Sequence, residues 1–88
     1  MAWTVELAGK ARKQLHSLDP NTQKRVLRFL RERISTDEDP RRVGHALRGE
    51  LSDLWRYRVG DYRIICRIED QRLVVLVLAF GHHSDVYG

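Results

Sequence analysis

Two short segments near the middle of this chain of 88 residues most strongly limit the folds open to it. Apolar and polar residues alternate from Leu54 to Val59 and again from Tyr62 to Glu69, which is typical of half-buried strands. Only Gly60-Asp61 separates the two segments, and a glycine that comes first in a two-residue loop fits a type II′ turn. The pattern therefore predicts an antiparallel hairpin in which Val59 pairs with Tyr62.

Two further strands are predicted near the ends of the chain. The run from Leu73 to Phe80 is continuously apolar, and its length, its β-branched residues and its flanking turns favour a central strand buried on both faces over a helix. Residues Trp3 to Leu7 alternate and predict a short opening strand. Cys66 falls in phase with Ile64 and Ile68, so we expect it to fill the core.

The residues between the opening strand and the hairpin predict two helices and a loop. Apolar residues recur at helical spacing in each helix: Leu7, Ala11, Leu15 and Leu18, then Val26, Leu27, Leu30 and Ile34. The second helix should begin with Asp19 as N-cap and Pro20 at its first position, and should end near Ile34. We expect Ser35 to Asp53 to be an irregular loop, held down by apolar residues at Val43, Ala46, Leu47 and Leu51.

The predicted order of elements is β-α-α-β-β-β. This order indicates an α+β fold, in which a helical hairpin packs on one face of a small, mainly antiparallel sheet. The chain contains no repeat, no low-complexity tract and no sign of a domain boundary. We therefore expect residues 1–88 to form one domain.

The composition excludes several classes of protein. Hydrophobic residues make up 42% of the chain and charged residues 32%, which fits neither a disordered nor a membrane protein. The first residues contain no apolar signal core, so we expect a cytoplasmic protein. The single cysteine, Cys66, excludes an internal disulfide framework and a cysteine-rich zinc site. We expect no metal and no cofactor.

The basic residues are mostly of one kind. Thirteen arginines but only three lysines give a formal net charge of +4. The planar guanidinium group binds phosphate through two hydrogen bonds and stacks on bases, which a lysine cannot do. The excess of arginine favours a nucleic-acid partner. The alternative is that these arginines only solvate the outer faces of the helices.

Several arginines are predicted to gather on one face of the hairpin. With Val59 opposite Tyr62, Arg58 lies directly across from Arg63, although like charges in that position destabilise a sheet. Arg56 and Arg67 fall on the same face, and no acidic residue lies in these rows. The pattern therefore indicates a preformed site for a polyanion, whose phosphate oxygens would supply the missing negative charge. The alternative is a solvated face from which the arginines splay outward.

The last residues add a second group of polar side chains. His82 and His83 are adjacent, and Tyr87 follows them. Adjacent histidines without a suitably spaced third ligand are a weak signal for metal binding. Imidazole groups do, however, change their charge near neutral pH, so this tail is a candidate source of acid–base groups.

With these residues in place, the chain resembles the RelE/ParE superfamily of bacterial toxin–antitoxin toxins over essentially its whole length. The resemblance lies in the opening strand and helical hairpin, Leu47-Arg48-Gly49, Trp55-Arg56-Tyr57-Arg58-Val59, Gly60-Asp61-Tyr62-Arg63-Ile64-Ile65, and the ending Gly81-His82-His83-Ser84-Asp85-Val86-Tyr87. It implies a RelE-like fold. For the RelE branch, it also implies a metal-independent endoribonuclease that enters the ribosomal A site and cleaves the mRNA codon. In that reaction a 2′-hydroxyl attacks the adjacent phosphate and leaves a 2′,3′-cyclic phosphate.

The resemblance also implies roles for particular residues. Arg56 and Arg58 occupy positions where the RelE branch usually carries lysines, Arg63 and Tyr87 match directly, and His83 stands where arginine is more usual. We expect these five residues to form the catalytic site, and we expect Arg48 and Arg67 to bind RNA. Arginines are implausible general bases, so Arg56 and Arg58 are better suited to hold phosphate, while His83 is suited to proton transfer. The identity of the general base stays open.

The resemblance finally implies partners. We expect a cognate antitoxin in a hetero-oligomeric complex, the ribosome with its mRNA as target, and no membrane. Two alternatives stay open. The chain could be a ParE-type inhibitor of DNA gyrase without nuclease activity, or a non-catalytic partner or inactive relative.

Overall fold

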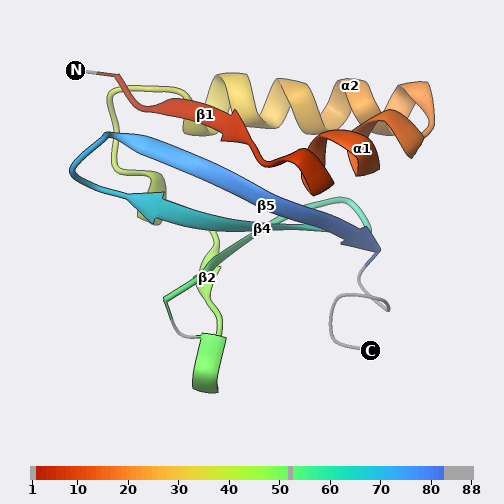
Figure 1. The fold of residues 1–88 in the computed structure, drawn as a ribbon. Helices are drawn as coiled ribbons and strands as arrows, with labels where there is room; N and C mark the ends of the chain where they lie inside the picture. Colours follow the sequence, from red (N-terminus) through yellow and green to blue (C-terminus); the bar gives the residue numbers. More distant parts are fainter. Residues whose placement is uncertain (1, 52, 83–88) are drawn as a thin grey trace.

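The computed structural model describes residues 2–51 and 53–82 of the chain. Within this part, five strands form one sheet in the order β1-β5-β4-β3-β2 (Figure 1). The strands are β1 (Thr4–Leu7), β2 (His45–Ala46), β3 (Trp55–Val59), β4 (Tyr62–Glu69) and β5 (Val74–His82). Strand β1 runs parallel to β5, and the other pairs are antiparallel. The predicted α+β fold with a mainly antiparallel sheet is confirmed.

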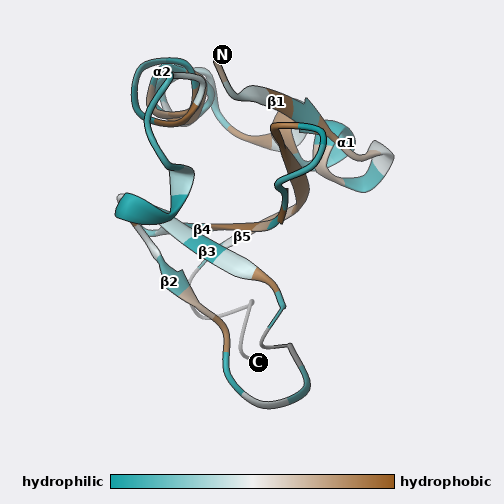
Figure 2. Ribbon diagram, turned by 90° about the vertical axis from the view of Figure 1, so that its left-hand side faces the viewer, coloured by the Kyte–Doolittle hydropathy of each residue, from teal (hydrophilic) through white to brown (hydrophobic). Residues whose placement is uncertain are grey.

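Both helices cover the same face of the sheet (Figures 1 and 2). Helix α1 spans Gly9–Ser17, and α2 spans Pro20–Phe29 and continues into a π-helical turn, Leu30–Ile34. The side chain of Asp19 accepts a hydrogen bond from the backbone N–H of Thr22 at 3.2 Å, and Pro20 follows as the first helical residue. The predicted N-cap and the predicted end of the second helix near Ile34 are therefore confirmed.

The central hairpin has the predicted register. Val59 pairs with Tyr62, and Arg58 pairs with Arg63. Gly60 has a φ of +59°, the left-handed conformation that the first position of this turn requires and that glycine adopts without strain. This register fixes which side chains share a face, and it therefore decides the arrangement of the candidate site.

The main hydrophobic core lies between the helices and the covered face of the sheet. It contains Trp3, Ala11, Leu15, Val26, Leu30, Ile34, Tyr57, Ile64, Cys66, Val75, Val77 and Phe80. Cys66 is fully buried in this core, as predicted, and burial raises the pKa of its thiol far above the ordinary value. The thiol therefore stays protonated and acts as a small apolar side chain.

The segment predicted to be an irregular loop contains more structure than expected. It holds a 3-10 helix at Pro40–Arg42, the two-residue strand β2, and a second 3-10 helix at Gly49–Leu51. Leu47 is buried and Val43 is half-buried, as predicted, but Ala46 is exposed because β2 lies at the edge of the sheet. The side chain of Leu51 lies outside the described part of the structure.

Two further predictions about burial are wrong. Leu27 is 43% exposed because Val26 and Leu30 face the sheet and Leu27 lies beside them on the flank of α2. Strand β5 is central, but Leu76 and Leu78 are only half-buried because both helices cover the opposite face. In the described residues, no helix combines the length and the apolar character needed to cross a membrane.

Candidate active site: an arginine-lined pocket at the sheet edge

Four basic residues share one face of the sheet. His45 in β2 pairs directly with Arg56 in β3, and Arg58 in β3 pairs directly with Arg63 in β4. Residues paired directly across antiparallel strands project to the same side, and so do residues two apart in one strand. The register therefore places His45, Arg56, Arg58 and Arg63 on the face opposite the buried neighbours Tyr57 and Ile64.

These four residues also line one pocket. It has a volume of about 230 Å³ and lies where β2 begins, at the point from which β3 continues along the edge of the sheet. Its lining consists of Phe29, Val43, Gly44, His45, Arg56, Tyr57, Arg58 and Arg63. The structure therefore brings together three of the four arginines that the sequence predicted to gather on this face, and it adds a histidine to them.

Arg63 carries hydrogen-bond donors that its neighbours leave unused. Its Nε and Nη1 atoms are buried and have no hydrogen-bond partner among the described residues. An unsatisfied buried donor costs about 1–3 kcal/mol, and more when the group is charged. The Nε of neighbouring Arg58 donates to the backbone carbonyl of Gly60 at 3.2 Å. The pocket thus contains charged donors suited to a bound anion.

The ion pairs recorded in the described part of the chain lie elsewhere. Arg41 binds Asp70 through two hydrogen bonds of 2.8 Å, and Arg42 contacts Glu38 at 3.1 Å. Arg72 contacts Glu69 at 2.7 Å and Glu6 at 3.3 Å. The hydrogen bonds from Arg41 hold the pKa of the Asp70 carboxyl below its ordinary value. None of these carboxylates lines the arginine pocket.

Gly44 sets the position of His45. Its φ is +81°, a left-handed conformation that other residues rarely adopt. A Cβ atom at this position would meet the carbonyl oxygen of Arg56, Nε1 of Trp55 and Cδ1 of Tyr57, all closer than 3.0 Å. Glycine therefore allows the chain to pass close to β3 and to enter β2 with His45 opposite Arg56.

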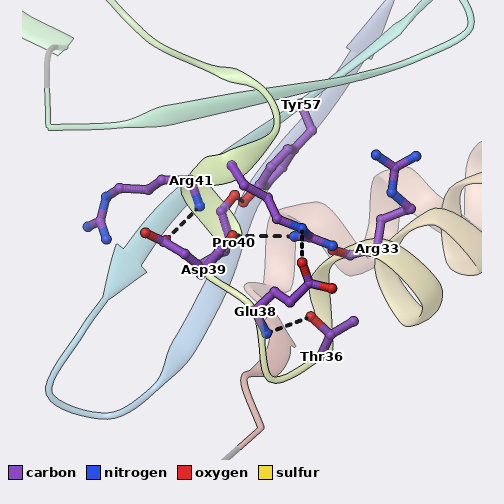
Figure 3. Close-up of polar contacts among 8 residues, drawn as sticks. Arg33, Thr36, Glu38, Asp39, Pro40, Arg41 and Tyr57 are labelled. Atoms are coloured by element: carbon purple, nitrogen blue, oxygen red, sulfur yellow. Dashed lines mark hydrogen bonds and ion pairs between the residues drawn. The ribbon is translucent and has the colours of Figure 1, made fainter.

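Polar anchors hold the segment before Gly44 against β3. The Nε1 of Trp55 donates to the carbonyl of Val43 at 2.8 Å. Figure 3 shows Tyr57 beside Pro40, where its buried hydroxyl donates to the Pro40 carbonyl at 2.7 Å. The carboxylate of Asp39 accepts from the backbone N–H of Arg41 at 2.9 Å and caps the short 3-10 helix. Burial raises the pKa of Tyr57 far above its ordinary value, so this hydroxyl is a structural donor.

Two arginines predicted to bind RNA lie outside the pocket. Arg67 is exposed on the same face but pairs with Leu76 farther along β4, and Arg48 is exposed between β2 and the following 3-10 helix. Neither arginine lines the pocket, so their contact with RNA stays a prediction. His83 and Tyr87 lie outside the described residues. His82 is exposed at the end of β5, with its ring edge-on to Tyr62 at 5.7 Å.

The chemical capacity of the described pocket follows from its side chains. Three guanidinium groups can bind phosphate oxygens and stabilise the negative charge that develops when a phosphodiester reacts. None of them can act as a general base, because arginine stays protonated in proteins. No group of three His, Cys, Asp or Glu residues in the described part of the chain could hold a metal ion.

Comparison with known proteins identifies the family. The sequence profile described as "ParE toxin of type II toxin-antitoxin system, parDE" matches residues 5–87. Toxin RelG of Mycobacterium tuberculosis is 37% identical over 87 residues, which cover 99% of this chain and 98% of that protein.

Two solved structures support the same assignment at the level of the fold. The toxin–antitoxin complex RelBE2 of Mycobacterium tuberculosis contains a chain that matches with a TM-score of 0.85 and 35% identity, covering 97% of this chain and 95% of that one. The isolated RelE toxin of E. coli has the same fold, with a TM-score of 0.73 and 22% identity over 98% of this chain and 92% of that chain. With its RelE-like structure, this chain belongs to the ParE toxin family of type II toxin–antitoxin systems.

Proposed function

We propose that this toxin is a ribosome-dependent mRNA endonuclease that inhibits translation. The observation that carries the proposal is the arginine pocket, in which Arg56, Arg58 and Arg63 line one cavity and two buried donors of Arg63 have no partner in the described part of the chain. A phosphodiester of the mRNA supplies the negative charge that the described lining of this cavity lacks. A solvated surface gives no reason to bury the guanidinium nitrogens of Arg63.

The proposed reaction uses a nucleophile from the RNA itself. A ribose 2′-hydroxyl attacks the adjacent phosphorus, the bond to the 5′-oxygen of the next nucleotide breaks, and a 2′,3′-cyclic phosphate remains. Charge builds up on the phosphate oxygens in the transition state. Arg58 and Arg63 bind those oxygens and stabilise this charge, and Arg56 holds the neighbouring backbone. Tyr87 stacks on a base near the reacting sugar, and His83 protonates the departing oxygen.

We further propose a cognate antitoxin as partner in a hetero-oligomer. The RelBE2 structure from Mycobacterium tuberculosis is of a toxin–antitoxin complex, which supports this proposal. On the described surface, exposed Leu27 lies in a groove of about 290 Å³ between α2 and β1, lined also by Val5, Leu7 and Leu30. Apolar antitoxin residues cover this groove, and acidic antitoxin residues neutralise the arginine pocket.

The test of the main proposal is primer extension on mRNA bound to purified ribosomes. The proposal expects breaks within the A-site codon when the toxin and the ribosome are both present, and none when the ribosome is left out. The products should carry 2′,3′-cyclic phosphate ends. An intact mRNA on toxin-treated ribosomes contradicts the proposal.

The second candidate function is inhibition of DNA gyrase. The match of residues 5–87 to the ParE toxin profile favours this reading, because the RelE/ParE superfamily includes toxins that poison gyrase. A supercoiling assay with purified gyrase, run on the same toxin preparation, separates the two functions. Loss of supercoiling together with intact mRNA supports the ParE-type activity.

A further inference from the structure

We propose that His45 is the general base that activates the 2′-hydroxyl in this pocket. The inference rests on the proposed ribonuclease function and assigns a role that the sequence leaves open. It begins from the register of β2 and β3, where His45 is paired directly with Arg56. The imidazole therefore belongs to the face that carries Arg58 and Arg63, and it lines the same cavity of about 230 Å³.

The size of the cavity keeps the imidazole near any phosphate held there. A volume of about 230 Å³ holds a phosphate and part of a ribose, and little more. A phosphodiester bound by the arginines therefore places its adjacent 2′-hydroxyl beside another wall of the same small cavity. His45 is exposed, so a substrate can reach it without any movement of the core.

The chemistry of the other residues that line the pocket excludes them from the role of general base. Arg56, Arg58 and Arg63 cannot release a proton near neutral pH. The hydroxyl of Tyr57 is buried and donates to the carbonyl of Pro40, and burial raises its pKa. Phe29, Val43 and Gly44 have no titratable group. Among the described residues that line the pocket, His45 is thus the one with an imidazole, the side chain most often used as a general base.

The proposed proton transfer and bond cleavage need no reactant other than the RNA, the toxin and water. The neutral imidazole of His45 takes the proton of the 2′-hydroxyl as the 2′-oxygen forms its bond to phosphorus. The bond from phosphorus to the 5′-oxygen then breaks, and that oxygen gains a proton from a second acid, the role predicted for His83, or from water. The imidazolium returns its proton to solvent before the next turnover.

Among the described residues that line the pocket, every charged group beside the imidazole is positive. Arg56 and Arg58 face it from β3, and Arg63 faces it from β4. The helix and the loop that complete the pocket contribute uncharged residues, Phe29, Val43 and Gly44. A phosphate that binds the arginines neutralises part of this charge and so offsets the cost of forming an imidazolium beside them.

The experiment compares two variants and a matched control in single-turnover cleavage of ribosome-bound mRNA. His45→Ala and His45→Gln remove the titrating group, and Gln keeps a polar side chain of similar reach. His16→Ala removes an exposed histidine from α1, a helix that contributes no residue to the described lining of the pocket. Rates are measured from about pH 5.5 to about pH 8.5, the range in which histidines change charge. Co-sedimentation with ribosomes measures binding separately.

The proposal expects both His45 variants to lose about 10²–10⁴-fold in cleavage rate while ribosome binding and the fold are retained. The rise of the wild-type rate with pH through neutrality should be absent in His45→Ala, and added imidazole should restore part of its rate. His16→Ala should match the wild type in rate and in pH profile.

Three results would overturn the assignment in distinguishable ways. A His45→Ala rate near that of the wild type removes the residue from the reaction. A lowered rate with the wild-type pH profile and no rescue by imidazole makes His45 a positioning residue. Absence of cleavage by the wild-type toxin refutes the proposed function itself, and the assignment of His45 falls with it.

Discussion

Arg58 and Arg63 are paired directly across β3 and β4, so two positive charges face each other where a sheet usually places opposite or neutral partners. The described ion pairs of the chain involve other arginines, and two buried nitrogens of Arg63 have no hydrogen-bond partner within residues 2–51 and 53–82. This arrangement opposes folding in the absence of a ligand. It therefore connects the stability of the toxin to the binding of anions.

Replacing Arg63 with alanine should abolish cleavage without loss of stability. Removing a donor that stabilises transition-state charge typically costs about 10²–10³-fold in rate. Removing the like-charge pair should leave the free energy of unfolding unchanged or raise it by up to about 1 kcal/mol. Urea unfolding and single-turnover cleavage measure the two effects. Arg12→Ala, which removes an exposed charge on α1, is the matched control. A variant that is less stable but equally active would indicate a structural arginine.

Replacing Gly44 with alanine should both destabilise the toxin and reduce its activity. The left-handed backbone alone costs a non-glycine residue about 1–2 kcal/mol, and the new Cβ would also collide with the Arg56 carbonyl. Gly49→Ala is the control, because Gly49 has a φ of +68° but nothing within 4 Å of the added Cβ. Thermal unfolding should therefore show a larger loss for Gly44→Ala. Equal losses in the two variants would mean that the close approach to β3 contributes nothing.

Stability should fall as the pH rises above about 9. Burial raises the pKa values of Cys66 and Tyr57 in the folded state, whereas the unfolded chain releases these protons near the ordinary values of 9.0 and 10.0. Above those values the folded state binds more protons than the unfolded state, so the free energy of unfolding decreases with pH. The slope is at most about 1.4 kcal/mol per pH unit for each group.

The Cys66→Ala variant isolates the contribution of the thiol. Urea unfolding under reducing conditions, at intervals from about pH 8 to about pH 10.5, should show a smaller decrease in this variant than in the wild type. Its overall stability will be lower because the smaller side chain leaves a cavity in the core. An identical slope in the two proteins would show that the thiol does not contribute to the pH dependence.

Tyr87→Phe should separate base stacking from hydroxyl chemistry. Stacking of an aromatic ring on a base contributes about 1–3 kcal/mol, and phenylalanine retains it. If the hydroxyl contacts the reacting sugar or phosphate, the variant will bind ribosomes normally and cleave slowly. Normal cleavage would show that stacking alone suffices. Tyr87→Ala, which removes both functions, should weaken binding as well.

The sequence predicted the hairpin well because a two-residue turn and two alternating strands determine a register without help from distant residues. The pairing of Arg58 with Arg63 follows from Gly60-Asp61 alone. The cap of α2 was predictable for the same reason, since Asp19 and Pro20 act within one turn of helix.

Features that depend on tertiary packing were not predictable in this way. Strand β2 has two residues, too few to show any periodicity, and it exists because Gly44 lets the chain approach β3. His45 was missed because only this pairing places it beside the arginines. The exposure of Leu27 depends on which flank of α2 the sheet covers, and apolar spacing along the helix does not reveal that.

The one-sided packing of the sheet has a consequence for how such a toxin can evolve. Along β3 and β4, one set of alternate positions holds core residues such as Tyr57 and Ile64, and the other holds the arginines of the pocket. A substitution at an arginine position leaves the helix-covered core intact, so the proposed activity can change in a lineage while the protein still folds.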